Sequence, residues 1–232
     1  MPLIYTKSPV REAERKYQSE AFCFVNEKRT KTLIEFCLAP LKIPRKEDFS
    51  MKILVTGFGS FLGHEVNPAE KVALALKNEH YATVILPVSY AQAQSAFNKI
   101  PNLRSYDFIL SLGLASGRKY ISLERMAYNE MNAIHLDNDG VRKMGEAIIA
   151  GQKPSLKTSV NVLKIHDALL QAGIPSDISD DPGRYICNEV YYLDLSSGIP
   201  ALFVHFPAIE TMSVEKDYEA IQVILATIKS SK

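Results

Sequence analysis

From Met51 onward, segments typical of strands alternate with segments typical of helices, and this alternation constrains the fold more than any other feature. The runs that predict buried strands are 51–57, 82–88, 107–112, 174–179 and 201–206. Helices are predicted from the cap at Asn67 to about Lys77, over 91–99, 160–172 and 187–195, and from about Ser213 onward. The alternation predicts an α/β fold, a three-layer α/β/α sandwich with a largely parallel, twisted sheet.

The first 50 residues differ from the rest of the chain. All eleven glycines lie beyond position 50, and Lys and Arg outnumber Asp and Glu before it. We interpret residues 1–50 as an N-terminal extension outside the main folded domain, which we place at 51–232. A start of translation at Met51 itself would account for this, and a regulatory or oligomerisation arm is the alternative.

Composition excludes several classes of protein. The 232 residues are 47% hydrophobic and carry a net charge of +1, which argues against extensive disorder and against nucleic acid as a partner. No apolar run reaches the ~20 residues that a membrane-spanning helix needs. The three cysteines have no disulfide or zinc spacing, and no export signal is recognisable. We therefore expect a cytoplasmic protein without a metal.

A glycine-rich turn, Thr56-Gly-Phe-Gly-Ser-Phe-Leu-Gly63, follows the first strand and precedes a helix. This is the context of a dinucleotide-binding turn, but its spacing is GxGxxxG, and no carboxylate follows the second strand. Nucleotide binding is therefore disfavoured. The turn is either purely structural, or its Phe58 and Phe61 form a pocket wall for a flat, uncharged ligand.

Three side chains are candidates for catalysis. Cys187 lies near a predicted helix N-terminus, where exposed N–H groups lower the pKa of a thiol, although a lone cysteine is as often a buried apolar residue. His205 lies near the end of a buried strand, where a core histidine is the usual alternative. If Cys187 is a nucleophile and His205 its base, Glu124 is the best-placed carboxylate to orient the imidazole.

From Met51 to its end the chain resembles the pyroglutamyl peptidase I (pyrrolidone-carboxylate peptidase) family of cysteine peptidases. Four blocks occur in the order typical of that family. They are Val55-Thr-Gly-Phe-Gly-Ser-Phe61 with Asn67-Pro68, then Gly113-Leu-Ala-Ser-Gly-Arg118, then Leu123-Glu-Arg-Met-Ala-Tyr-Asn129 with Asp137-Asn138, and last Gly183-Arg-Tyr-Ile-Cys-Asn188 with Phe203-Val-His-Phe-Pro207.

The resemblance implies a cofactor-free thiol hydrolase that removes an N-terminal pyroglutamyl group from peptides. It implies a triad with Cys187 as nucleophile, His205 as general base and then acid, and Glu124 as the orienting acid. It also implies homo-oligomers, often tetramers. The substrate-binding residues that it implies are Phe58, Phe61, Asn67, Tyr185 and Ile186.

The chain departs from many bacterial members of that family at two places. Leu114 stands where they have glutamine, and Ile134-His135 stands where they have arginine and isoleucine. The short stretch between Cys187 and His205 is more similar to animal-type members. These departures sustain one alternative hypothesis, a catalytically weak or inactive relative that binds a lactam-like ligand or a protein partner.

Overall fold

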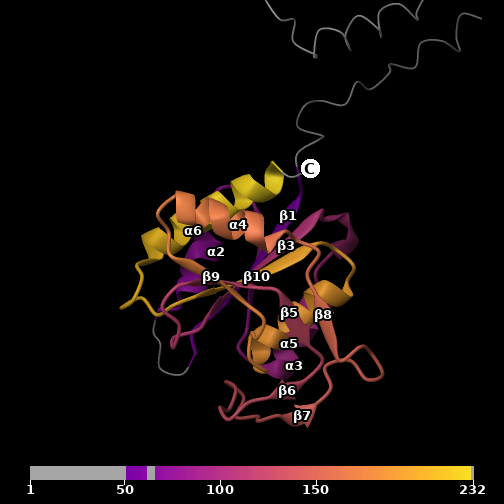
Figure 1. Ribbon diagram of the computed structural model, residues 1–232. Helices are drawn as coiled ribbons and strands as arrows, with labels where there is room; N and C mark the ends of the chain where they lie inside the picture. The colour runs from indigo at the N-terminus through magenta and orange to yellow at the C-terminus, as the bar shows by residue number, and fades with distance from the viewer. Residues whose placement is uncertain (1–50, 62–65, 231–232) are drawn as a thin grey trace, which may run out of the picture. The chain divides into compact units, whose positions relative to one another are not determined.

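The computed structural model describes residues 51–61 and 66–230 (Figure 1). The predictions made for residues 1–50, and for Leu62 and Gly63 of the glycine turn, lie outside these ranges. Within them, no helix is long and apolar enough to cross a bilayer.

A six-stranded sheet forms the centre of the domain, with the strand order β2-β1-β3-β10-β4-β9. Every neighbouring pair is parallel except β10 and β4, which run antiparallel. The prediction of a largely parallel sheet is therefore confirmed. The strands are β1 (Ile53–Phe58), β2 (Ala82–Leu86), β3 (Phe108–Leu114), β4 (Ile121–Glu124), β9 (Ser176–Ser179) and β10 (Ala201–Phe206).

Helices cover both faces of the sheet, which confirms the three-layer architecture (Figure 1). One face carries α2 (Pro68–Asn78), α4 (Val162–Gln171) and α6 (Val214–Lys229). The other face carries α3 (Tyr90–Asn98) and α5 (Ile186–Ser196), and a single 3₁₀ turn, η2 (Leu103–Ser105), follows α3. The helix start predicted at Asn67 is correct, because the Asn67 side chain accepts a hydrogen bond from Ala69 N at 3.0 Å.

Two small antiparallel ribbons were not predicted from the sequence. One pairs β5 (Met126–Tyr128) with β8 (Ser155–Lys157), and the other pairs β6 (Met131–Asn132) with β7 (Met144–Glu146). Both lie on the α5 side of the domain (Figure 1). Strands of two or three residues are too short to show a hydrophobic period, so the sequence gives no signal for them.

The alternation of side chains along β10 and β4 decides which polar residues face α5. In β10, Leu202, Val204 and Phe206 belong to the core under α2, α4 and α6, whereas Phe203 belongs to the core under α5. In β4, Ile121 and Leu123 likewise face the first core. Because side chains alternate between the faces of a sheet, His205 and Glu124 emerge on the α5 face.

Candidate active site

Cys187 is the second residue of α5, two positions after the N-cap Tyr185, so it lies near a helix N-terminus as the sequence predicted. Its partly buried side chain lies against β3, where a Cβ placed on Gly113 would come within 3.1 Å of Cys187 Sγ. Gly113 is the register partner of His205 in the adjacent strand β10. The fold therefore brings the thiol over the strand pair that carries the histidine.

His205 and Glu124 form a buried hydrogen-bonded pair. His205 Nδ1 lies 2.8 Å from Glu124 Oε1, and the two side chains are 3% and 0% exposed. When Nδ1–H donates to the carboxylate, Nε2 of the neutral ring is left as the acceptor. This is the tautomer that a general base requires.

Arg118 completes the surroundings of the carboxylate, and its role was not predicted from the sequence. Arg118 Nη1 lies 2.7 Å from Glu124 Oε1, the same oxygen that His205 contacts. Its Nη2 donates a hydrogen bond to the Asp181 carbonyl oxygen at 2.8 Å. The guanidinium therefore joins the acid to the segment that precedes α5.

The predicted acidity of the thiol is wrong for the free protein. Burial, and after it the negative charge of Glu124, raise the pKa of Cys187 to about 12. The charge of Arg118 and the backbone N–H of Cys187 itself lower the pKa, as the helix N-terminus predicts, but they do not outweigh burial. Cys187 is therefore a neutral thiol near pH 7, and its proton must be removed during the reaction.

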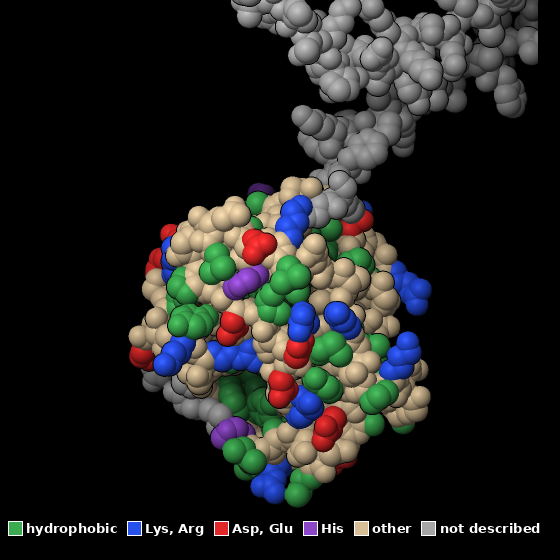
Figure 2. All heavy atoms as spheres, viewed as in Figure 1, with side chains coloured by type: hydrophobic (Ala, Val, Ile, Leu, Met, Phe, Trp, Pro, Cys, Tyr) green, Lys and Arg blue, Asp and Glu red, His purple; other side chains and the backbone are tan. Residues whose placement is uncertain are grey.

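A cavity of about 210 Å³ opens beside Cys187. All five residues predicted to bind substrate line it together with the thiol. Its walls are mainly apolar, and the rings of Phe61 and Tyr185 lie 5.0 Å apart across one side. The face shown in Figure 2 is hollowed, with hydrophobic side chains inside the hollow and charges of both signs scattered around it. The predicted residues are Phe58, Phe61, Asn67, Tyr185 and Ile186.

Two polar side chains of the wall are held by the protein itself. Asn67 Nδ2 donates to the Gly59 carbonyl oxygen at 2.8 Å while its oxygen caps α2, so this side chain fixes the glycine turn. The Tyr185 hydroxyl donates to the Leu136 carbonyl oxygen at 3.0 Å, which ties the 134–136 loop to the pocket. Both walls are therefore preformed rather than assembled by a ligand.

The positions at which the sequence departs from many bacterial members of the family differ in their relation to the pocket. Leu114 lines the pocket, together with Ala115, Ser116, Val88 and His135. Ile134 is 81% exposed and is not among the lining residues. The motif at 113–118 pointed to part of this wall, whereas Val88 and His135 carried no signal of their own, because only the tertiary fold brings them to the pocket.

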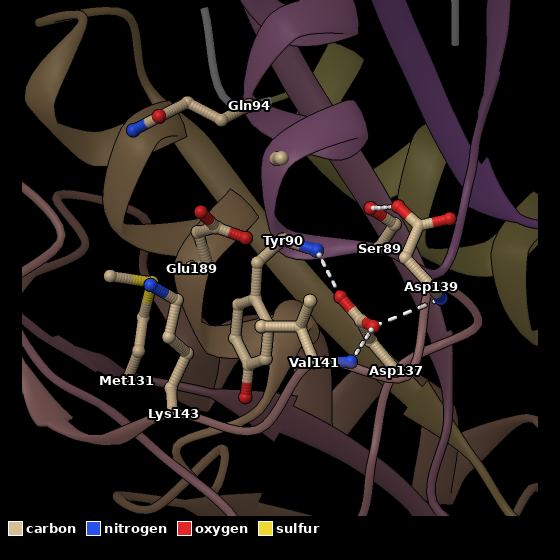
Figure 3. A pocket seen from close by; sticks show the side chains of 10 residues that line it. Ser89, Tyr90, Gln94, Met131, Asp137, Asp139, Val141, Lys143 and Glu189 are labelled. Atoms are coloured by element: carbon tan, nitrogen blue, oxygen red, sulfur yellow. Dashed lines mark hydrogen bonds between the residues drawn. The ribbon is translucent and has the colours of Figure 1, made fainter.

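A second cavity, of about 220 Å³, lies between α3, α5 and the loop around Asp137 (Figure 3). Glu189 lines it and is 2% exposed; its Oε2 has no hydrogen-bond partner among the described residues, and burial raises its pKa to about 8. Tyr90 lines it as well, and its ring packs edge-on against Tyr185 at 5.5 Å. Cys187 does not line this cavity, so the first one is the candidate substrate pocket.

A thiol at a helix N-terminus, a histidine bonded to a buried carboxylate and an adjoining apolar pocket on an α/β fold together define the class of the thiol hydrolases. The particular family follows from comparison with known proteins. The family model described as pyroglutamyl peptidase matches residues 51–230. The chain belongs to the pyroglutamyl peptidase family.

Individual relatives agree with this assignment. The pyrrolidone-carboxylate peptidase of Pyrococcus furiosus is 34% identical over 177 residues, which are 72% of this chain and 85% of that protein. That of Oceanobacillus iheyensis is 34% identical over 172 residues, 68% of this chain and 84% of that protein. The crystal structure of the pyrrolidone carboxyl peptidase from Fervidobacterium islandicum superposes with a TM-score of 0.73 at 33% identity, covering 78% of this chain and 99% of that one.

Proposed function

We propose that this chain removes the N-terminal pyroglutamyl residue from peptides, with Cys187 as nucleophile, His205 as general base and acid, and Glu124 as the orienting carboxylate. One observation carries the proposal. The buried 2.8 Å bond between His205 Nδ1 and Glu124 Oε1 involves the strand next to Gly113, against which Cys187 Sγ lies, and Cys187 itself lines an apolar pocket. Membership of the pyroglutamyl peptidase family supports the reaction itself.

The reaction begins with a neutral thiol. His205 Nε2 accepts the proton of Cys187 as Sγ attacks the carbonyl carbon that joins the pyroglutamyl ring to the next residue. The resulting imidazolium is stabilised by Glu124. Because burial raises the pKa of the thiol, His205 has to take its proton during the reaction.

The negative charge that develops on the carbonyl oxygen needs hydrogen-bond donors. The first N–H groups of a helix have no acceptor within the helix, and the Tyr185 side chain does not cap α5. These N–H groups, that of Cys187 among them, serve as the oxyanion site. The imidazolium then gives its proton to the leaving nitrogen, the C–N bond breaks, and a pyroglutamyl thioester remains on Sγ. A water molecule deprotonated by His205 hydrolyses the thioester and releases pyroglutamate.

The chemistry of the pocket suits this substrate. A pyroglutamyl ring is flat and uncharged, so its affinity must come from burial against apolar walls with a few hydrogen bonds. The rings of Phe58, Phe61 and Tyr185 supply such walls. A free N-terminal glutamate carries charges that these walls cannot solvate, and it is therefore excluded.

Release of a fluorescent amine from pyroglutamyl-coumarylamide tests the proposal. We expect turnover of this substrate and none of the glutamyl or leucyl analogues. Tight binding of pyroglutamate without any turnover would favour the alternative, a non-catalytic relative. If the protein neither turns over this substrate nor binds pyroglutamate, both hypotheses are contradicted.

We also propose that residues 51–232 are the complete catalytic domain. The family model begins at residue 51, and the first strand of the sheet begins two residues later, at Ile53. A fragment that begins at Met51 should fold and match the full chain in kcat/KM. A fragment that aggregates or loses activity would assign the first 50 residues a role in the domain.

A further inference from the structure

Glu124 lies in an environment that does not tolerate a negative charge unless it is compensated. Its side chain is fully buried, and Oε2 has no hydrogen-bond partner among the described residues. Burial disfavours the charged form of a carboxyl group. For catalysis, however, Glu124 must be charged while His205 is still neutral, because a protonated His205 cannot act as a base.

Arg118 supplies the compensating charge. Its Nη1 lies 2.7 Å from Oε1, and arginine stays protonated at any pH of interest. With Arg118 in place, the buried pair of Arg118 and Glu124 is neutral overall, so His205 needs no proton of its own. Without Arg118, the buried Glu124 carboxylate loses the positive charge that lies 2.7 Å from the oxygen that His205 also contacts.

The Arg118 guanidinium also holds the segment of the chain that leads into α5 and Cys187. Arg118 Nη2 donates to the Asp181 carbonyl oxygen, and the Asp181 side chain in turn accepts from Gly183 N at 3.0 Å and from Arg184 Nη1 at 2.6 Å. This segment leads directly into α5, which carries Cys187. The planar guanidinium of Arg118 therefore contacts both the Glu124 carboxylate and the loop that precedes Cys187.

The backbone of Arg118 is itself fixed next to the histidine strand. Arg118 N donates to the Ala115 carbonyl oxygen at 2.9 Å, and Ala115 N donates to the Phe206 carbonyl oxygen at 2.8 Å. Phe206 follows His205 at the end of β10. The Arg118 side chain is only a quarter exposed, and two of its guanidinium nitrogens, Nη1 and Nη2, are bonded to protein oxygens, which distinguishes it from an ordinary surface arginine.

We propose that Arg118 is a positioning residue of this enzyme, which keeps Glu124 charged while His205 is neutral and holds the loop before Cys187. This inference rests on the proposed function. It extends that function by a residue that touches neither the substrate nor the reacting atoms.

The first test measures kcat and KM for pyroglutamyl-coumarylamide between about pH 5 and 9. Arg118→Met should lower kcat about tenfold to a hundredfold near pH 7, the loss expected for a hydrogen bond to a charged group, with KM changed by less than about twofold. The pH profile of kcat should change as well, because the positive charge beside the pair of Glu124 and His205 has been removed. Arg118→Lys should recover part of kcat, since a lysine restores the positive charge but not the planar guanidinium that reaches two oxygens at once.

Arg125→Met is the matched control. The Arg125 side chain forms an exposed ion pair with Asp180, the neighbour of Asp181 in the same loop, whereas Arg118 pairs with the Glu124 carboxylate. Its variant should match the wild type in kcat at every pH. The proposal is overturned if Arg118→Met keeps the wild-type kcat and profile, if its loss lies in KM, or if Arg118→Lys is no better than Arg118→Met.

A second test needs no substrate, so that failure of the proposed function is recognised separately. The nitrogen NMR shifts of the His205 ring report its protonation. Near pH 7, Arg118→Met should change these shifts, because the carboxylate that the ring contacts loses its charged partner, whereas Arg125→Met should not. Unchanged shifts would overturn the inference even in an active enzyme. Changed shifts in a protein without turnover would uphold the inference about Arg118 and refute the proposed function.

Discussion

Gly113 offers the sharpest structural prediction, because it occupies the contact between the nucleophile and the histidine strand. A Cβ at this position would lie 2.8 Å from two ring atoms of Phe203 and 3.1 Å from Cys187 Sγ. The Phe203 ring is fully buried and is surrounded by the rings of Phe58, Tyr191 and His205, at centroid distances of 6.4, 5.6 and 4.7 Å. It cannot move aside without displacing one of these neighbours.

Gly113→Ala should therefore cost both stability and activity. Overpacking in a core costs about 1–3 kcal/mol, reduced by the roughly 0.4–1 kcal/mol that replacing a glycine gains through the unfolded chain. In a domain of this size, this predicts a decrease of several degrees in Tm, at about 2–4 °C per kcal/mol. A displacement of Sγ or His205 approaching 1 Å should lower kcat about a hundredfold.

Gly117→Ala is the control, because a Cβ at Gly117 meets nothing within 4 Å and its φ is not positive. Thermal unfolding followed by circular dichroism and turnover of pyroglutamyl-coumarylamide should separate the two variants. A Gly113→Ala enzyme with wild-type kcat and Tm would refute the packing described for the site. Equal losses in both variants would refute the explanation through Cys187 and Phe203.

Three further predictions concern the pocket and its titrating groups. Phe61→Ala should raise KM far more than it lowers Tm, since its partly exposed ring packs on Tyr185 in the pocket wall; an unchanged KM would contradict this. Glu189→Gln should stabilise the protein by an amount that grows as the pH rises from about 4 to 8. The pKa of Glu189 is raised to about 8, so the wild type loses stability over this window, by a few kcal/mol at about 1.4 kcal/mol per pKa unit. A difference in Tm that does not depend on pH would contradict this. The third prediction uses a chain with Cys23→Ser and Cys37→Ser, so that iodoacetamide reports on Cys187. The rate of alkylation should increase up to and beyond about pH 9, because the pKa of Cys187 is raised to about 12. A rate that levels off near pH 7 would indicate a preformed thiolate.

The large elements of the fold were predictable because each carries a local signal. The strands β1, β3 and β10 are continuous apolar runs, and the caps at Asn67 and Ser213 mark helix starts directly in the sequence. The strand β4 was not among the predicted strands, and its antiparallel pairing with β10 is decided by contacts between segments far apart in the chain.

The site was predictable in its members but not in its electrostatics. Residue types and motif order pointed to the cysteine, the histidine and the acid, and the histidine and acid meet across 81 positions of sequence. The raised pKa of Cys187 depends on burial by distant segments, which no local pattern reports. Arg118 stands in a recognisable block, but its contact with Glu124 depends on how the loop after β3 folds back.

The central claim is that Cys187 carries the pyroglutamyl group during turnover. Rapid acid quenching during the reaction with pyroglutamyl-coumarylamide, followed by peptide mapping with mass spectrometry, would locate the thioester directly. We expect the pyroglutamyl group on Cys187 alone, in an amount that rises when Glu124→Gln slows deacylation, and no adduct or turnover in Cys187→Ala. Turnover that persists in Cys187→Ala, or an adduct on Cys23 or Cys37, would contradict the mechanism.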